Sequence, residues 1–419
     1  MNLEKYSIGI GDRFGREGVA QLRALVEAKK LGVDIVPVWN KSNREHTLIG
    51  TSPGNVRVEA DAAVRELSWR ASYYVDADHI GLATVDKFIA SSDFYTIDVA
   101  DYIGKPATRE STDAFLRDMA KFKGTLQIPG VDAAVEVTDA LLMEVARKYL
   151  YALEEAGKVY RHIVEKKGEN SFVAEVSVDE ADKPQNPIEL FFILAGIARE
   201  KIAIQTIAPK FTGSFLKGID YVGDIRQFAR EFEDDISVIA FAVKTFNLPE
   251  NLKLSVHSGS DKFSLYPVMH AAIARCKAGL HLKTAGTTWL EEVIGLAASG
   301  NDGLEIAKEI YAAAFNRFDE LAKPYLPVIQ IDRTKLPEPR EVAKWDERQF
   351  VETLRHNQSS RMYSIHFRQL VHIGFRIAAE MGEKYNQRLT EYRAEIEKNV
   401  TENLLVRHIR PLFLGQAAD

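Results

Sequence analysis

Three histidines stand where short apolar runs of the sequence end: His79, His257 and His281. Neutral imidazoles combined with a carboxylate form a common site for zinc, manganese and related metals. If these runs are strands of one barrel, His257 and His281 lie on neighbouring strands and point into one opening. The alternative is that each is a hydrogen-bonded loop histidine, because their spacing matches no specific motif such as HExxH. The trio predicts a metal site in the first case only.

Carboxylates accompany these histidines. Asp78 directly precedes His79, and Asp179 and Glu180 together end another apolar run. Consecutive residues of a strand point to opposite faces, so one of each pair should do chemistry while its neighbour bonds the scaffold. Both can face the site only where the strand has ended, which Gly81 allows after His79. A carboxylate beside a metal can act as general acid or base, and a loop or helix cap is the alternative role.

Four further histidines belong to helical segments. His162 and His408 lie in charged stretches and are expected to face solvent. His366 and His372, six residues apart in YSIHFRQLVHIGFR, either close over the active site or have a structural role. None of the four is included in the predicted metal site.

The elements that must position these residues alternate between strand and helix. Eight short apolar runs end in polar or glycine residues, at 6–15, 34–40, 73–81, 94–104, 171–180, 202–211, 252–262 and 279–288. Alternation with helices implies parallel pairing through right-handed crossovers. Eight units favour a closed (β/α)8 TIM-like barrel over an open doubly wound sheet, and such barrels carry their active sites at the C-terminal ends of the strands.

The chain is longer than the roughly 250 residues of a minimal barrel. We expect a single barrel domain over residues 1–419, with a helical insertion at about 105–168 and a helical C-terminal extension at about 301–419. Within the insertion, the segment STDAFLRDMAKF begins with a serine and a threonine suited to capping a helix.

Charge and composition exclude several functions. The net charge of −6 provides no basic excess of the kind that nucleic-acid binding needs. Cys276 is the single cysteine, so no internal disulfide can form. No window holds the ~20 consecutive apolar residues of a membrane span, the N-terminus lacks a signal-peptide core, and neither GxGxxG nor a P-loop occurs. We expect a cytoplasmic protein without nucleic-acid or membrane partners, able to form homo-oligomers.

Several long strings resemble the tagaturonate/fructuronate epimerase family of bacterial hexuronate catabolism. They include WNKSNREH, YVDADHIG, EVSVDE, HSGSDKFSLYP and HLKTAGT, within a similarity running from near residue 9 to near residue 376. The resemblance implies an isomerase that interconverts D-tagaturonate and D-fructuronate with a divalent metal, zinc first and otherwise manganese, nickel or cobalt. It also implies related 4-epimerase activity on D-tagatose and D-fructose, and the sequence does not decide between uronate and neutral sugar.

The resemblance also implies roles for residues in the matching strings. Asp78 and Glu180 would be opposed acid/base groups, and His79, His257 and His281 would bind the metal. Polar residues of the strand-end loops would bind the substrate: Arg13, Lys41, Arg44, Lys210, Ser258, Asp261, Lys262 and Lys283. Two-point binding of the substrate carboxylate favours the two arginines, although each can instead pair with a neighbouring carboxylate.

The position of the epimerised carbon constrains the mechanism. It lies one bond beyond the carbon next to the ketone, so its C–H is not acidified by the carbonyl. Transient oxidation would need a nicotinamide, for which the sequence has no Rossmann fingerprint. In retro-aldol cleavage a base takes the hydroxyl proton and the adjacent C–C bond breaks, giving a metal-stabilised enediolate and an aldehyde that recombines on its other face. We expect this second route.

Two alternatives stay open. A metal-dependent aldose–ketose isomerase on the same barrel would move a proton between adjacent carbons and exchange it with solvent. A non-catalytic sugar-acid-binding protein would keep the barrel, although simple binding does not need three histidines.

Overall fold

The computed structural model describes residues 1–417 and forms a closed parallel barrel. Its strands are Tyr6–Ile10 (β1), Val36–Ser42 (β2), Tyr74–Ile80 (β3), Phe94–Asp98 (β4), Val173–Ser177 (β7), Thr206–Ala208 (β8), Lys253–His257 (β9) and Leu280–Lys283 (β10). Around the barrel they follow the order β1, β10, β9, β8, β7, β4, β3, β2. Each overlaps one predicted run, so the (β/α)8 barrel is confirmed and the open sheet is excluded.

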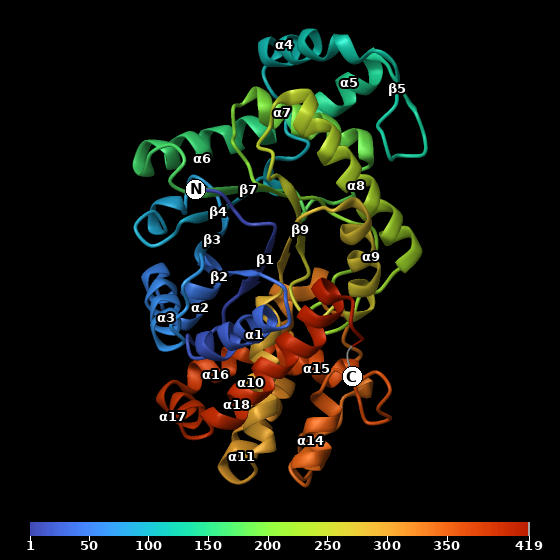
Figure 1. Cartoon of the computed structure of the whole chain (residues 1–419). Helices are drawn as coiled ribbons and strands as arrows, with labels where there is room; N and C mark the ends of the chain where they lie inside the picture. The colour runs from blue at the N-terminus through green and yellow to red at the C-terminus, as the bar shows by residue number, and fades with distance from the viewer. Residues whose placement is uncertain (418–419) are drawn as a thin grey trace.

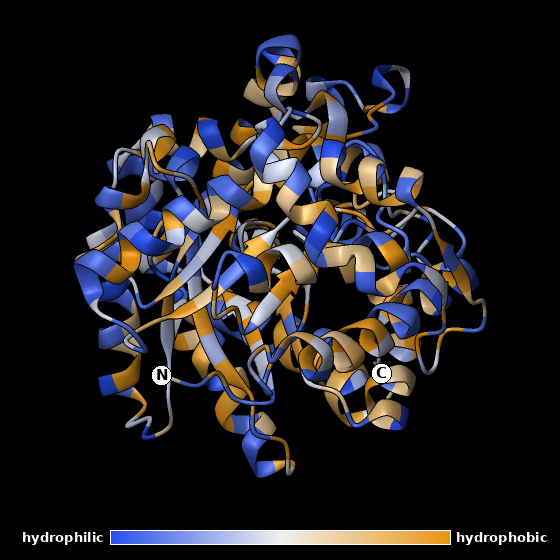
Figure 2. Cartoon of the chain, turned by 90° about the horizontal axis from the view of Figure 1, so that it is seen from above, coloured by the Kyte–Doolittle hydropathy of each residue, from blue (hydrophilic) through white to orange (hydrophobic). Residues whose placement is uncertain are grey.

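Helices surround the barrel and connect its strands. They are Gly18–Lys30 (α1), Asn43–Ile49 (α2), Pro53–Glu66 (α3), Pro187–Arg199 (α7), Ile225–Phe246 (α8), Tyr266–Cys276 (α9) and Thr288–Ala298 (α10), with a 3-10 turn at Val85–Lys87 between β3 and β4. Asn186 and Glu189 form a reciprocal capping box at the start of α7, which fixes where the loop after β7 ends. Figure 2 shows apolar segments on the central strands and mixed polar and apolar faces on the surrounding helices.

An insertion between β4 and β7 extends the barrel at one end of the molecule (Figure 1). It contains the helices Arg109–Met119 (α4), Asp139–Val145 (α5) and Tyr151–Lys167 (α6). It also contains a small antiparallel pair, Gly124–Leu126 (β5) and Val135–Val137 (β6), which the helical prediction did not include. The insertion is therefore mainly, but not wholly, helical.

The C-terminal extension is helical, as predicted, and lies at the opposite end of the molecule (Figure 1). Its helices are Asn301–Asn316 (α11), Phe318–Ala322 (α12), Pro339–Val342 (α13), Glu347–Leu354 (α14), Ile365–Ile373 (α15), Phe375–Met381 (α16), Glu383–Glu391 (α17) and Arg393–Glu402 (α18), followed by a π-helix at Asn403–Leu414 (η9). In the described part of the chain, no helix has both the length and the apolar character that crossing a membrane requires.

Side chains inside the barrel change from apolar to polar along the strands. An apolar cluster fills the N-terminal end: Leu3, Val36, Val38, Tyr74, Phe94 and Val173. Because every second residue of a strand points to the same face, Tyr74 is followed inside by Asp76, Phe94 by Thr96 and Val173 by Glu175. The sequences of β3, β4 and β7 thus help to close one end of the barrel and place polar groups at the other.

A buried carboxylate at the start of α1 makes stability depend on pH. Glu17 is 1% exposed, and burial together with the charges of Asp12 and Glu397 raises its pKa to about 8. Between pH 4.5, the ordinary pKa of a glutamate, and about pH 8 the unfolded chain loses a proton that the folded protein keeps. The free energy of unfolding therefore falls as pH rises through this window.

Glu17→Gln should remove this dependence and raise the free energy of unfolding by on the order of 2 kcal/mol at pH 8. Urea unfolding at pH 5 and pH 8 measures the effect, and Glu27→Gln, a half-exposed position on the same helix, is the control. An unchanged pH dependence in Glu17→Gln would contradict the prediction.

Candidate active site

An irregularity in β3 turns both Asp78 and His79 toward the interior. The pairing of β3 with β4 shifts register between Ala77 and Ile80, and His79 has a φ of 50°, which side-chain-bearing residues rarely adopt. Strict alternation ends at this point. As a result, Asp78 Oδ1 lies 3.8 Å from His79 Nε2. Strict alternation predicted that only one of these two residues faces the site, but both do.

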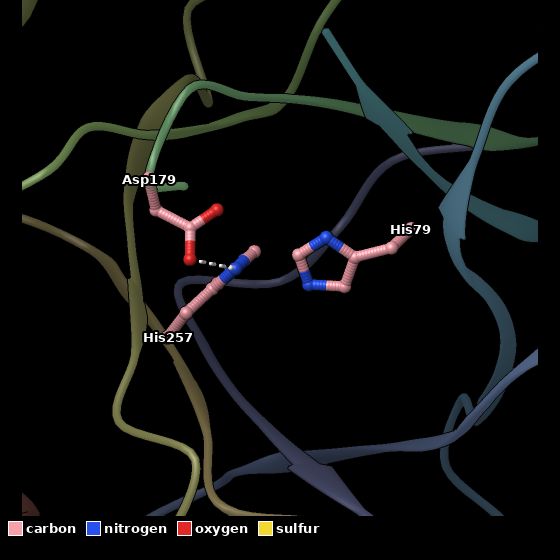
Figure 3. Close-up of side chains that lie close together, drawn as sticks. All are labelled: His79, Asp179 and His257. Carbon is pink, nitrogen blue, oxygen red and sulfur yellow. Dashed lines mark ion pairs between the residues drawn. The ribbon is translucent and has the colours of Figure 1, made fainter. Parts of the chain in front are cut away.

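Two histidines are each held by a carboxylate on one ring nitrogen. His79 Nδ1 lies 3.0 Å from Asp98 Oδ2, and His257 Nε2 lies 2.7 Å from Glu175 Oε1. The other nitrogen of His257, Nδ1, is 3.1 Å from Asp179 Oδ2 (Figure 3) but makes no hydrogen bond with any residue in 1–417. The two rings meet edge to face, with centroids 5.1 Å apart. Each histidine therefore has one ring nitrogen, Nε2 of His79 and Nδ1 of His257, that could bind the same ion.

These residues fit a divalent metal ion. One ligand atom from each of His79, Asp179 and His257 lies within 4.8 Å of the others, and His79, Asp98 and Glu180 form a second such group. Imidazole nitrogen with carboxylate oxygen is a usual ligand set for zinc and its neighbours. Metal-bound histidines also commonly donate their second N–H to a carboxylate, as both do here. Nδ1 of His257 faces the Asp179 carboxylate at 3.1 Å but has no hydrogen-bond partner within residues 1–417, so it is the atom that a cation would satisfy.

The electrostatics of the site favour a cation as well. Burial alone would lower the pKa of both histidines, but the charge of Asp78 and the hydrogen bond to Asp98 raise that of His79 to about 10. In the same way Asp179 and Glu175 raise the pKa of His257 to about 9 against its burial. The surrounding carboxylates thus stabilise positive charge at the two histidines, and a divalent ion bound in place of their protons would supply that charge.

Lys283 lies among three carboxylates just below the histidines. Its Nζ is 2.7 Å from both Asp76 Oδ2 and Asp78 Oδ1 and 3.6 Å from Glu175 Oε1. Burial raises the pKa of Asp76, and despite the opposing charge of Lys283 it reaches about 6. For Asp78 the charges of Lys283 and His79 outweigh burial and lower the pKa to about 2. Asp78 is therefore ionised at neutral pH.

His281 lies one layer deeper in the barrel than His257. The β10–β9 register pairs Lys283 with His257, so His281 pairs with Ser255, roughly 6–7 Å further from the site. Its Nδ1 is 2.9 Å from Ser7 Oγ, and burial lowers its pKa to about 3. Among residues 1–417, neither group of ligand atoms includes His281.

Most of the predicted substrate-binding side chains are engaged by protein groups. Backbone carbonyls accept hydrogen bonds from Lys41, Lys210, Ser258 and Lys262, and Lys283 is bound as described above. These side chains therefore shape the loops around the site, and any contact with substrate must compete with the bonds that they already make.

The two predicted arginines lie at the contact between barrel loops and the C-terminal extension. The Arg13 guanidinium carbon is 4.3 Å from the ring centroid of Phe375, and that of Arg44 is 5.8 Å from the ring of Tyr325. Arg13 is also 3.6 Å from Glu45, the neighbour of Arg44 in sequence. The extension thus forms part of the surroundings of the site.

Asp261 is held in a fully buried network that joins the loop after β9 to the extension. Its Oδ2 is 2.7 Å from Arg368 Nη2 and 3.0 Å from His356 Nδ1, and its Oδ1 accepts a hydrogen bond from Thr287. The prediction that His408 faces solvent is wrong. The residue is 0% exposed, and its Nε2 lies 3.4 Å from Asp261 Oδ1. The π-helix that carries His408 packs against α1 and α9, which buries this face.

Four carboxylates of the site were not among the predicted site residues: Asp76, Asp98, Glu175 and Asp179. Asp98 and Asp179 stand in polar strand tails, and Asp179 lies beside the preferred Glu180. Glu175 had a clearer signal. A carboxylate in the middle of the apolar run SFVAEVSV must be buried, and buried carboxylates have partners.

A closed parallel barrel with polar side chains gathered at the C-terminal ends of its strands is the architecture of a (β/α)8 enzyme, and the histidines and carboxylates gathered there could hold a metal ion. The family model of tagaturonate epimerase matches residues 1–412, and the chain belongs to this family. It is therefore an epimerase, an enzyme of the isomerase class.

Two further comparisons agree with this assignment. The tagaturonate/fructuronate epimerase of Thermotoga maritima is 30% identical over 381 residues, which cover 88% of this chain and 72% of the relative. Crystal structures of the fructuronate–tagaturonate epimerase of Cohnella laeviribosi, with one glycerol and native, have TM-scores of 0.79 and 0.78 at 24% identity. Both matches cover 98% of this chain and 82% of the other, and they support the fold.

Proposed function

We propose that the protein interconverts D-tagaturonate and D-fructuronate with a divalent metal held by His79, Asp179 and His257. The observation that carries the proposal is the pair of carboxylate-backed histidines beside Asp179 in a member of the tagaturonate epimerase family. The name of the Thermotoga maritima relative supports the choice of substrates. Zinc suits the ligand set, with manganese, nickel and cobalt as the other candidates. When bound, the metal polarises the substrate ketone.

Retro-aldol cleavage and re-addition suits the groups around His79. Asp78 takes the proton from the hydroxyl on the epimeric carbon, the bond to the carbon next to the ketone breaks, and its electron pair forms an enediolate. The aldehyde fragment turns, the enediolate attacks its other face, and Glu180 protonates the new alkoxide. Both carboxyls then exchange protons with solvent, so no atom is gained or lost. The low pKa of Asp78 makes it a weak base, so the substrate hydroxyl must be acidified for this transfer.

Epimerisation in deuterated water is expected to leave the epimeric C–H unlabelled, because that bond never breaks. Tagaturonate is incubated with metal-loaded protein, and the products are analysed by NMR. Deuterium at the epimeric carbon would exclude retro-aldol cleavage. Solvent label at the carbon next to the ketone, with an aldose as product, would favour the aldose–ketose isomerase. No turnover with any of the four metals would overturn the epimerase proposal and favour a binding protein.

A further inference from the structure

Helix α15 holds the loop that follows β8. Gln369 Nε2 donates a hydrogen bond of 3.0 Å to the carbonyl of Lys217, and the Arg368 guanidinium donates to the carbonyl of Gly218. The amide of Gly218 in turn donates to Ser260 Oγ at 2.9 Å. The backbone of Lys217 is thereby fixed between the C-terminal extension and the loop after β9.

His372, one turn further along α15, is buried without a protein partner. It is 1% exposed, and within residues 1–417 neither ring nitrogen has a hydrogen-bond partner. A Cβ added to Gly286 would lie 3.8 Å from His372 Cε1, the carbon between the two nitrogens. The polar edge of the ring therefore faces the loop after β10. Buried polar groups normally have partners, so this ring is suited to bind a ligand.

Lys217 approaches the same two loops. A Cβ on Gly259 would lie 3.2 Å from Lys217 Nζ, and a Cβ on Gly286 would lie 2.0 Å from the Gly259 carbonyl oxygen. The absence of a side chain at Gly286 therefore allows the loops after β9 and β10 to touch. Lys217 and His372 converge on this contact from the loop after β8 and from α15.

Arg13 completes a cationic group with these two residues. Its guanidinium lies over Phe375, three residues after His372, and its buried Nε has no hydrogen-bond partner in the described residues. The charges of Arg13 and Lys217 both act on His372.

Positive charge exceeds negative charge around Lys217. Burial and the charges of Arg44 and Arg13 lower its pKa, despite the attraction of Glu45 and Glu180. A bound anion would relieve this excess. Because Glu180 also shares a ligand group with His79, the cationic group lies beside the candidate metal site.

We propose that Arg13, Lys217 and His372 bind the carboxylate of the substrate and so make the enzyme specific for uronates over neutral ketohexoses. The proposal rests on the proposed function, in which the ketone end of the substrate lies at His79 and His257. The two cations supply charge and the imidazole donates one N–H, a combination that a carboxylate satisfies and a terminal CH2OH does not. Lys217 and His372 act as specificity-determining residues from outside the barrel strands.

Steady-state kinetics on D-tagaturonate and D-tagatose test the proposal in Lys217→Met and His372→Leu. We expect KM for tagaturonate to rise roughly 10- to 100-fold, the effect of losing a hydrogen bond to a charged group, while kcat/KM for tagatose stays unchanged or rises. Lys217→Arg should restore part of the uronate affinity. The controls are Lys183→Met, an exposed lysine in the loop after β7, and His366→Leu, on the same helix as His372, and both should behave as wild type.

A second measurement separates binding from a structural role. The melting temperature of His372→Leu should equal or exceed that of wild type, because an unpartnered buried imidazole is replaced by an apolar group. Equal losses on both sugars, or unchanged kinetics on tagaturonate, would overturn the proposal.

Calorimetric binding of tagaturonate distinguishes failure of this proposal from failure of the proposed function. Binding that is weakened by Lys217→Met in a protein without epimerase activity would uphold the carboxylate site and overturn the epimerase. A wild-type protein that neither binds nor converts tagaturonate would overturn both.

Discussion

His257→Ala should lose its metal and about 1,000-fold or more in kcat/KM, because polarisation of the ketone accounts for several kcal/mol of transition-state stabilisation. His79→Ala should behave in the same way, since both residues belong to the group of ligand atoms that includes Asp179. Metal content by plasma mass spectrometry, measured beside epimerase activity, tests the pair. Full metal content in both variants would exclude the proposed ligands.

Two further variants sharpen this test. Glu175→Gln keeps His257 but weakens the bond that orients it, and should cost roughly 10- to 100-fold in metal affinity or activity. His281→Ala shows whether the deeper histidine contributes to metal binding, as first predicted, or only bonds Ser7. His162→Ala, paired with Asp86 on the surface of the barrel, is the control and should retain both metal and activity.

Lys283→Met should destabilise the protein by about 3–5 kcal/mol at pH 7, because removing one partner of a buried ion pair leaves the other charged. Here Asp76 and Asp78 would both lose a cation at 2.7 Å. In wild type, the depressed pKa of Asp78 contributes stability above pH 3.8, the ordinary pKa of an aspartate, and this stability is lost as pH falls toward about 2. Without Lys283 the carboxyls protonate at higher pH, so the difference between variant and wild type should shrink between pH 7 and pH 4.

Urea unfolding at pH 7 and pH 4 measures this difference. Lys253→Met is a matched control, since Lys253 is also buried in the barrel but donates to the carbonyls of Leu3 and Glu4. Its loss should be smaller and should not shrink on acidification. Equal stabilities of the two variants at pH 7 would contradict the role assigned to Lys283.

The barrel was predictable because the signal for a strand is local. Each strand reads as a short apolar run, and Tyr74, Asp76 and Asp78 show within one segment how the interior face changes from apolar to polar. The depth of a residue was not predictable, because register depends on pairing between strands. His257 and His281 look equivalent in sequence, yet the β9–β10 register separates them by one layer.

The contribution of the C-terminal extension was not predictable either. The ion pair of Asp261 with Arg368 joins positions 107 residues apart, and a local sequence pattern does not predict such a contact. His372 illustrates the same limit. The sequence around His372 is compatible with a structural role and with a position over the site. The residue comes to lie beside Lys217 because α15 packs on the loop after β8.

The Asp261 network has a consequence for biosynthesis. Arg368, His356 and His408 all leave the ribosome after every strand of the barrel has been made. Until they arrive, the carboxylate of Asp261 lacks these partners, and burial without them would be costly. The loop that follows His257 can therefore reach its final conformation only after the helical extension has folded. We expect a newly made chain to become active only at this last step of folding.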